Sequence, residues 1–586
     1  MKSRTFFSAI AVLAGFILLL GIAGFWGLTA QNPRALLTEG GQITPTAAQF
    51  VPRQAPIMVS LLARPDRLWS LRQVLTAPGK RFKAQQEWQA LKTTLADLVG
   101  WEYDVDVRPW LDEELTFAVT TADLDHDSSN GLQTGYLAVF SCQDGQKARE
   151  AIHLLWQQRI ASGQTLIFET VSGIPLIYNQ KPVDPFLSSL KTESKQPAIK
   201  IASLASAVIS DRYVLLANHP QVLRQAIATF QAPDVSLAQA STYQASIQAL
   251  SNNRIGWLYA HVPTLLTWLG LEEPELNRSI PERGRRVDHL FLSFRATLTG
   301  LLGNAAIAAA PGTAFKADDG ATQESQTPKL LDILPAETRF VTSGKNLSAL
   351  LSETAQNVGG YSIVQRSLNA LLVSLSLPSD LTSSQLWESF SGSYALGLLS
   401  GPKPTWILAT QIKGDTPFDT FDALAQQQGL TVSHIPFGQQ DLTTWTQLSI
   451  IPKTPNSPTN LETKVIGVHT QINGYAIFST SLLGLQQVIQ IDKQASLSEQ
   501  SAFVSLMNSL EQSYEDDGDI AYIDWPRLAP ALANRFPWLR VIEQAGQPFT
   551  AHLGPILLSG RSNDQSLQEG IVAIKLRETQ PRLPDN

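Results

Sequence analysis

The chain contains two similar segments, residues 44–310 and 327–576, and this duplication constrains the fold more than any single motif does. Each segment begins near a Thr-Pro dipeptide, which leads to a second proline (Pro52 and Pro335) and then to a short apolar run. The repeated features are apolar patterns and turn residues. We therefore expect two copies of one folding unit, not two copies of a catalytic apparatus.

Further matches keep the same order along both segments, while the loops between them differ in length. The matched stretches are Asp211–Ile227 with Asn473–Ile489, Ser236–Gln244 with Ser496–Val504, Ile255–Leu265 with Ile520–Leu528, and Leu292–Arg295 with Leu558–Arg561. The first match aligns Tyr213 with Tyr475. A conserved order with variable loops is what a duplicated domain with a common core produces.

The length of 586 residues is too great for one hydrophobic core and suits two domains. Charged residues make up only 16% of the chain, the net charge is −7, and no basic tract occurs. A surface that binds nucleic acid needs clustered lysine and arginine to neutralise phosphates. This composition therefore argues against a nucleic-acid partner.

The amino terminus predicts a membrane anchor. Residues 6–28 carry no charge and are long enough to cross a bilayer, and Lys2 and Arg4 precede them. This charge bias predicts a cytoplasmic N-terminus (residues 1–5), a tether (residues 29–43) and an exported body, periplasmic or thylakoid-luminal. The alternative is a cleaved secretory signal, although the apolar run is longer than such signals usually have.

Cys142 is the single cysteine, so the chain can form no intrachain disulfide and no zinc site based on thiolates. It follows a strand-like run and is interpreted as an inert thiol at a strand end.

Strand patterns outnumber helical ones, and strict alternation of strand and helix is absent. The predicted fold class is α+β, with two tandem copies of one domain, each with a mostly antiparallel or mixed sheet covered by helices on one face, preceded by one N-terminal transmembrane helix. A linker (residues 311–326) separates the copies, and a disordered tail (residues 577–586) ends the chain. Whether the two sheets join is left open by the sequence.

One acidic stretch resembles part of a calcium-binding loop. The alternate oxygen-bearing residues are Asp123, Asp125, Asp127 and Asn130. A complete loop of this type needs glycine at its sixth position and glutamate at its twelfth, where this chain has Ser128 and Thr134. The three aspartates are therefore weak metal candidates, and a solvated hairpin turn is the favoured interpretation.

The eight histidines show no HExxH pair and no other short ligand spacing. His153 falls in a predicted helix, and His261 and His289 fall in or beside strand-like runs, so we expect hydrogen-bonded structural histidines. No nucleophile elbow, phosphate loop or dinucleotide fingerprint occurs. The sequence thus predicts no catalytic residue and no cofactor.

Three features of each copy carry a resemblance to a known family. They are the openings Phe50–Pro52 and Ile333–Pro335, the block Asp106–Leu115 with its counterpart Leu386–Gly392, and the strands that contain Tyr213 and Tyr475. The chain resembles the cyanobacterial, membrane-anchored family of domain of unknown function 3352, over nearly everything after residue 44. The resemblance implies an architecture and assigns no site residues.

From these observations we expect a non-enzymatic, membrane-anchored extracytoplasmic protein. It would serve as a scaffold or assembly protein for other envelope or thylakoid proteins, with the membrane contacted through residues 6–28. One alternative is a carrier of a hydrophobic small molecule, such as a lipid or pigment. A second alternative is a divergent hydrolase whose nucleophile and base meet only in space.

Overall fold

The structure of the chain is a computed structural model that describes most of residues 35–577. The longer stretches outside the described residues are 1–34, 76–80 with parts of 81–99, 128–132, 180–203, 272–285, 316–329, 362–391 apart from Arg366, 412–417, 452–459, 512–518, 536–551, 562–565 and 578–586, and shorter gaps occur at 39, 42–43, 251–252, 299, 359 and 402–403.

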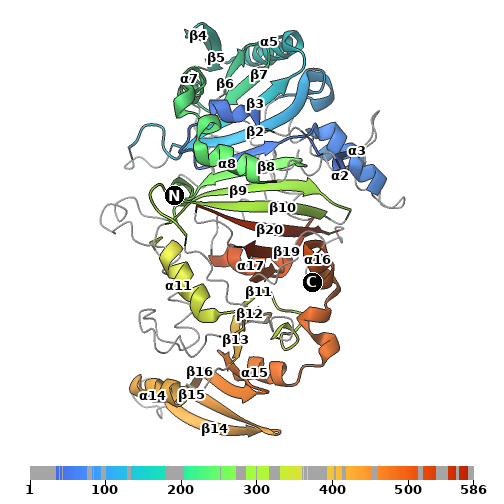
Figure 1. Cartoon of the computed structure of the whole chain (residues 1–586). Helices are drawn as coiled ribbons and strands as arrows, with labels where there is room; N and C mark the ends of the chain where they lie inside the picture. Colours follow the sequence, from blue (N-terminus) through green and yellow to red (C-terminus); the bar gives the residue numbers. More distant parts are fainter. Residues whose placement is uncertain are drawn as a thin grey trace.

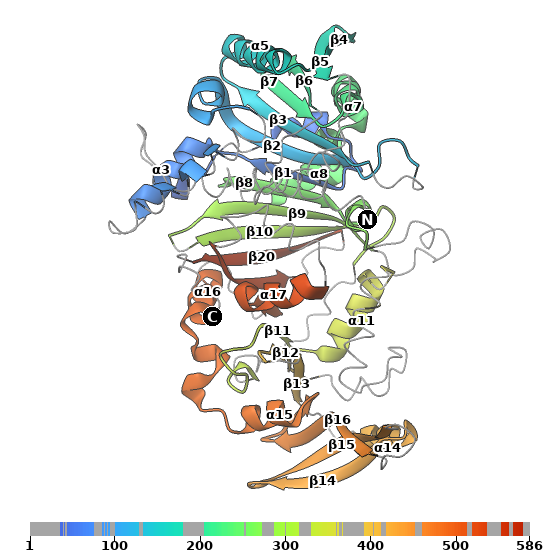
Figure 2. The ribbon, with the colours of Figure 1, turned by 180° about the vertical axis from the view of Figure 1, so that it is seen from behind.

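Twenty strands of the described chain form one continuous sheet, and every pairing between them is antiparallel. Figures 1 and 2 show the strands stacked from β4 at one end of the molecule to β14 at the other.

From the outer edge to the middle, the first half contains β4 (Leu166–Val171), β5 (Ile174–Asn179), β6 (Ala205–Ile209), β7 (Tyr213–Ala217), β3 (Gly135–Cys142), β2 (Leu111–Thr121), β1 (Ile57–Leu61), β8 (Gly256–His261), β9 (Val287–Ala296) and β10 (Gly300–Ala309).

The second half repeats this order with β14 (Thr431–Phe437), β15 (Gln440–Ile451), β16 (Asn460–Ile472), β17 (Tyr475–Ser479), β13 (Thr405–Gln411), β12 (Tyr394–Leu399), β11 (Phe340–Gly344), β18 (Ile520–Ile523), β19 (Leu553–Arg561) and β20 (Leu567–Leu576).

The same isolated β-bridge also occurs in each half. Pro52 pairs with Ser236 in the first half, and Pro335 pairs with Ser496 in the second. Ser236 and Ser496 are both almost fully buried, so the bridge ties the opening segment of each half to its interior.

The two halves meet at β10 and β20, which pair along nearly their whole length. Residues that are direct partners on successive strands form an equivalent row in each half, from β1 or β11 to the junction. The rows are Met58, Tyr259, Phe291 and Ala306 in the first half and Val341, Tyr522, Leu557 and Ala573 in the second. Asn304 lies two residues before Ala306, and Ile571 lies two residues before Ala573, so Asn304 and Ile571 are equivalent. These two residues are direct partners in the β10–β20 ladder. Equivalent strands are thus joined about a local twofold axis.

The fold class predicted from the sequence is therefore corrected. The sequence predicted a mostly antiparallel or mixed sheet in each of two domains and left open whether the two sheets join; the structure has one sheet that runs through both halves, and every pairing between its described strands is antiparallel. An unpaired β10 or β20 would expose a row of free backbone groups, and pairing the two removes both edges.

A membrane-spanning helix was also part of the predicted fold class. No helix within the described ranges is long and apolar enough to cross a bilayer. The segment predicted to do so, residues 6–28, lies outside the described residues, as do most of the predicted linker and nearly all of the predicted tail.

Helices cover both faces of the sheet, which corrects the prediction of one covered face. Alternate residues of β3 show this: Tyr136 and Ala138 belong to a core with helix α5, whereas Leu137 and Val139 belong to a core with helix α7. The described α-helices are α2 (Ala35–Thr38), α3 (Pro65–Leu75), α5 (Gly145–Ala161), α7 (Pro220–Gln231), α8 (Ser241–Ala249), α9 (Val262–Trp268), α11 (Leu347–Asn357), α14 (Phe418–Gln427), α15 (Leu482–Ile489), α16 (Ser501–Glu511) and α17 (Trp525–Arg535).

Helix α5 shows how local sequence forms these elements. The Asp144 side chain accepts hydrogen bonds from the backbone N–H groups of Gln146 and Lys147 and so caps the helix. Apolar residues at helical spacing, among them Ile152 and Trp156, then turn toward the sheet. The sequence alone predicts both features, because Asp144 stands directly before a run whose apolar residues recur at helical spacing, and the structure confirms them.

Candidate functional site

A pocket of about 570 Å³ opens on the first half, beside the ends of strands β1, β2 and β8. Its wall combines the segment before β1, the end of β2, helix α7 and helix α9. The lining residues are Pro52, Gln54, Pro56, Thr120, Thr121, Ala122, Asp123, His126, Gln225, Ala228, Thr229, Ala232, Val235, Thr264 and Thr267. Small and polar side chains dominate this lining.

Two histidines and an aspartate converge next to this pocket. His261, the last residue of β8, lies directly opposite His289 of β9, so both rings project from the same sheet face. The Asp288 carboxylate reaches both rings: Oδ1 lies 3.5 Å from His261 Nε2, and Oδ2 lies 3.2 Å from His289 Nε2. These side chains are 13–18% exposed.

A β-bulge explains how Asp288 can share a face with its neighbour His289. In the β9–β10 ladder Ala308 pairs with His289, and the next residue, Ala309, pairs with Val287, so Asp288 has no partner of its own. An extra residue of this kind bends the strand and redirects a side chain. Without the bulge, adjacent residues of β9 would point to opposite faces.

Hydrogen bonds at the other ring nitrogens orient both histidines. His261 Nδ1 lies 2.8 Å from the hydroxyl of Thr264, which is 3.1 Å from the carbonyl oxygen of Gln54 in the pocket wall. His289 Nδ1 lies 3.4 Å from the hydroxyl of Tyr259. Thr264 therefore links the pocket to the His261–Asp288–His289 cluster.

The electrostatics of this cluster favour an ionised carboxylate and a neutral ring at His289. Burial alone would raise the pKa of Asp288, but the hydrogen bond from His261 and the field of both histidines lower it. Burial lowers the pKa of His289, and His261 lowers it further, against the opposing effect of Asp288. The cluster thus pairs the Asp288 carboxylate with the His289 imidazole, whose pKa lies below its ordinary value.

The second half does not repeat this cluster. Ile57 and Phe340 are equivalent residues of the two halves, and they pair with Ala260 and Ile523. The residues that follow these partners, His261 and Asp524, therefore occupy equivalent positions. Asp524 is buried and forms an ion pair with Arg527, at 2.9 Å.

The weak metal candidates of the sequence, Asp123, Asp125 and Asp127, lie in the hairpin between β2 and β3. Asp123 Oδ1 accepts a hydrogen bond from the backbone N–H of Gln133 at 3.0 Å, and Asp125 Oδ1 accepts one from the N–H of Asp127 at 3.1 Å. Among the described residues, the group whose ligand atoms converge within 4.8 Å is His261, Asp288 and His289, and the three aspartates are not part of it.

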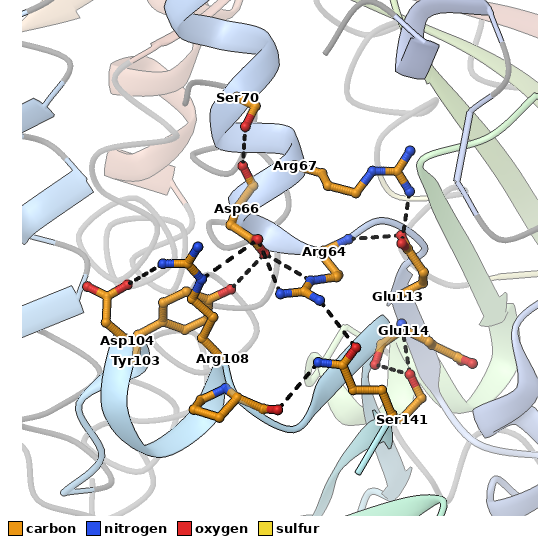
Figure 3. A network of polar contacts seen from close by, with 12 residues as sticks. Arg64, Asp66, Arg67, Ser70, Tyr103, Asp104, Arg108, Glu113, Glu114 and Ser141 are labelled. Carbon is orange, nitrogen blue, oxygen red and sulfur yellow. Dashed lines mark hydrogen bonds and ion pairs between the residues drawn. The ribbon is translucent and has the colours of Figure 1, made fainter. Parts of the chain in front are cut away.

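A second polar network connects helix α3 with the segment before β2 (Figure 3). The Asp66 carboxylate accepts hydrogen bonds from Arg64 (3.2 Å) and from the hydroxyl of Tyr103 (3.3 Å), while Arg67 contacts Glu113 at 2.8 Å. Burial raises the pKa of Tyr103 well above its ordinary value. Each acid faces a donor from another element, so this network joins elements and leaves no acid–base pair directed at a pocket.

Glu114 performs a similar structural task in the interior. Its carboxylate accepts hydrogen bonds from the backbone N–H groups of Thr46 (2.7 Å) and Ala47 (3.0 Å) and from the hydroxyl of Thr116 (2.9 Å). It thereby holds the start of the 3₁₀ helix η1 (Thr46–Phe50) against β2. Burial raises the pKa of Glu114, against the effect of these hydrogen bonds.

In the second half, Asp422 of α14 receives hydrogen bonds from two aromatic side chains. Trp445 Nε1 lies 2.6 Å and His469 Nε2 lies 2.9 Å from the same carboxylate oxygen. The His469 ring also stacks on Phe418, with a centroid separation of 4.5 Å. This arrangement is enclosed by aromatic rings and serves packing.

The sequence analysis treated His261 and His289 as two separate structural histidines and did not predict that they are neighbours in the sheet. They are 28 positions apart in the sequence, and only the register of β8 against β9 makes them neighbours. A usable signal was available in the sequence, because both runs read as strands, one ends in histidine and the other starts with Val-Asp-His.

The fold and the site define a class of protein: a duplicated, single-sheet antiparallel α+β chain with a pocket in its first half. A family model described as Protein of unknown function (DUF3352) matches residues 11–576, so the chain belongs to that family. This confirms the resemblance seen in the sequence. None of the curated proteins and none of the solved structures to which the chain was compared matches it.

Proposed function

We propose that the protein is a non-enzymatic scaffold that binds other proteins at the two ends of its sheet. The observation that carries this proposal is the equivalence of the end strands. Within the described chain, β4 pairs on one side only, with β5, and β14 pairs on one side only, with β15. Exposed edge strands offer backbone donors and acceptors to an added strand from a partner.

Apolar side chains at both ends support the same conclusion. Phe168 of β4 is 71% exposed, and Ile435 of β14 is 37% exposed. On the elements next to them in the chain, Leu154 of α5 and Leu448 of β15 are also exposed. Apolar groups beside a free strand edge provide the side-chain contacts that give strand addition its specificity.

The spacing of the two ends suits a bivalent scaffold. With neighbouring strands about 4.8 Å apart, the edges of a twenty-stranded sheet lie roughly 90 Å apart along the sheet. Two partners bound there would not contact one another, and one partner with two binding segments would gain from the linkage.

The alternatives gain less support. Apart from His126, the residues that line the pocket include no aromatic ring, and Val235 is their largest aliphatic side chain, so the pocket offers few of the large apolar contacts that a carrier of lipid or pigment uses. A hydrolase would need a hydroxyl whose proton is directed at a base. The Thr264 hydroxyl lies 2.8 Å from His261 Nδ1, but it also lies 3.1 Å from the carbonyl oxygen of Gln54 and 3.3 Å from that of His261, so two carbonyls compete with the ring for its single proton.

Cross-linking mass spectrometry on the full chain in native extracts tests the scaffold. We expect cross-links to partner proteins to cluster on β4 and β14, with Phe168→Glu removing the first set and Ile435→Glu the second. Leu298→Glu, on an equally exposed leucine in the β9–β10 turn, is the matched control and should retain both sets. Unchanged cross-links in the double variant would contradict the proposal.

A further inference from the structure

We propose that His261, Asp288 and His289 bind one divalent transition-metal ion, with Zn²⁺ as the natural probe. One ligand atom from each residue lies within 4.8 Å of the other two. Two imidazoles and one carboxylate are a donor set that such ions prefer, whereas Ca²⁺ and Mg²⁺ prefer oxygen donors alone.

The distances within the cluster suit a metal better than a direct hydrogen bond. Two donors each about 2.1 Å from a tetrahedral ion lie about 3.4 Å apart. The observed separations between Asp288 oxygens and the Nε2 atoms are 3.5 Å for His261 and 3.2 Å for His289. Both are long for a charge-assisted hydrogen bond, which is about 2.7–2.9 Å.

The outer hydrogen bonds are compatible with the tautomer that a metal requires in both rings. The Tyr259 hydroxyl donates its proton to the carbonyl oxygen of Arg53, so its oxygen is left to accept from His289 Nδ1–H. The Thr264 hydroxyl lies 3.1 Å from the carbonyl oxygen of Gln54, and a proton donated to that carbonyl leaves the hydroxyl to accept from His261 Nδ1–H, 2.8 Å away. Each ring that donates through Nδ1 keeps a lone pair on Nε2, and both Nε2 atoms face the Asp288 carboxylate.

Lone pairs and a carboxylate that face one another repel unless a cation lies between them. A metal ion supplies that charge without a proton on either ring. Three protein ligands leave at least one coordination position for water or another ligand. Because Asp524 replaces His261 in the second half, we expect one ion per chain.

Isothermal titration of the untagged full chain with Zn²⁺, after chelator treatment, tests this site. We expect one saturable site, weakened at least about 100-fold by His261→Gln, Asp288→Asn or His289→Gln, and about 10- to 100-fold by Thr264→Val, which removes an orienting partner. His153→Gln removes a solvent-exposed histidine on α5 and should leave the affinity unchanged.

X-ray absorption at the zinc edge of the wild-type chain gives an answer that does not depend on how the variants fold. We expect nitrogen and oxygen ligands that include two imidazoles. Absence of saturable binding, a sulfur ligand from Cys142, or an affinity unchanged in all three ligand variants would overturn the proposal. Loss of partner cross-links in the edge-strand variants bears on the scaffold alone, so the two proposals can fail separately.

Discussion

Asn304 and Ile571 are direct partners in the β10–β20 ladder, and they occupy equivalent positions in the two halves of the chain. The local twofold axis therefore passes through this pair. Each half uses its last strand to cover the last strand of the other, so neither half ends in a free edge at the middle of the molecule. The stability of the whole sheet should depend on how closely these two strands approach.

Gly300→Ala should weaken this junction. A Cβ atom at Gly300 would overlap the carbonyl oxygen of Ile574 on β20, a backbone atom that cannot rotate away. We expect a loss of about 1–3 kcal/mol in the free energy of unfolding, measured by urea denaturation. Gly560→Ala is the control, because a Cβ atom there meets nothing within 4 Å. Equal stability of the two variants would show that the junction is less tightly packed than the structure indicates.

Glu114→Gln should destabilise the first half. The amide side chain presents one oxygen and one NH₂ group to donors that all need an acceptor, so a backbone N–H of Thr46 or Ala47 loses its partner. A buried donor without a partner costs about 1–3 kcal/mol, which thermal or urea unfolding can measure. Glu113→Gln, in a partly exposed ion pair with Arg67, should cost no more than about 1 kcal/mol. The reverse order of stability would refute the capping role of Glu114.

Cys142 should resist alkylation in the folded chain. Burial raises the pKa of its thiol to about 12, so almost no thiolate is present at neutral pH. We expect iodoacetamide to label the native protein very slowly and the urea-unfolded protein readily, as read by intact-mass spectrometry. Rapid labelling under native conditions would mean that the end of β3 opens.

Local features of this fold could be predicted from the sequence because they depend on neighbouring residues. The Asp144 cap and the buried stripe of α5 are of this kind. Pro52, Pro335, Ser236 and Ser496 were matched by sequence alone, and the structure places them in the same bridge twice.

Features that depend on pairing between distant strands could not be predicted. The sequence match between the two halves aligned Trp257 with Tyr522. The strand pairing shows instead that Tyr259, two residues after Trp257, is the equivalent of Tyr522. A shift of two keeps every side chain on its original face, so the hydrophobic pattern cannot detect it. The joining of β10 to β20 and the approach of His261 to His289 escape sequence reasoning for the same reason: strand register sets both.

His469 should make the stability of the second half depend on pH. Burial lowers the pKa of His469 below its ordinary value of 6.5, although the Asp422 carboxylate acts in the opposite direction. As the pH falls below 6.5, His469 binds a proton in the unfolded chain but not yet in the folded chain. The unfolded state is therefore stabilised relative to the folded state until the pH reaches the pKa of His469 in the folded chain. We therefore expect the free energy of unfolding to decrease on acidification through this window. Urea unfolding at a series of pH values should show a smaller decrease in His469→Gln than in the wild type, whereas His153→Gln, which removes an exposed ring on α5, should follow the wild type. A decrease of the same size in His469→Gln would assign the pH dependence to other groups.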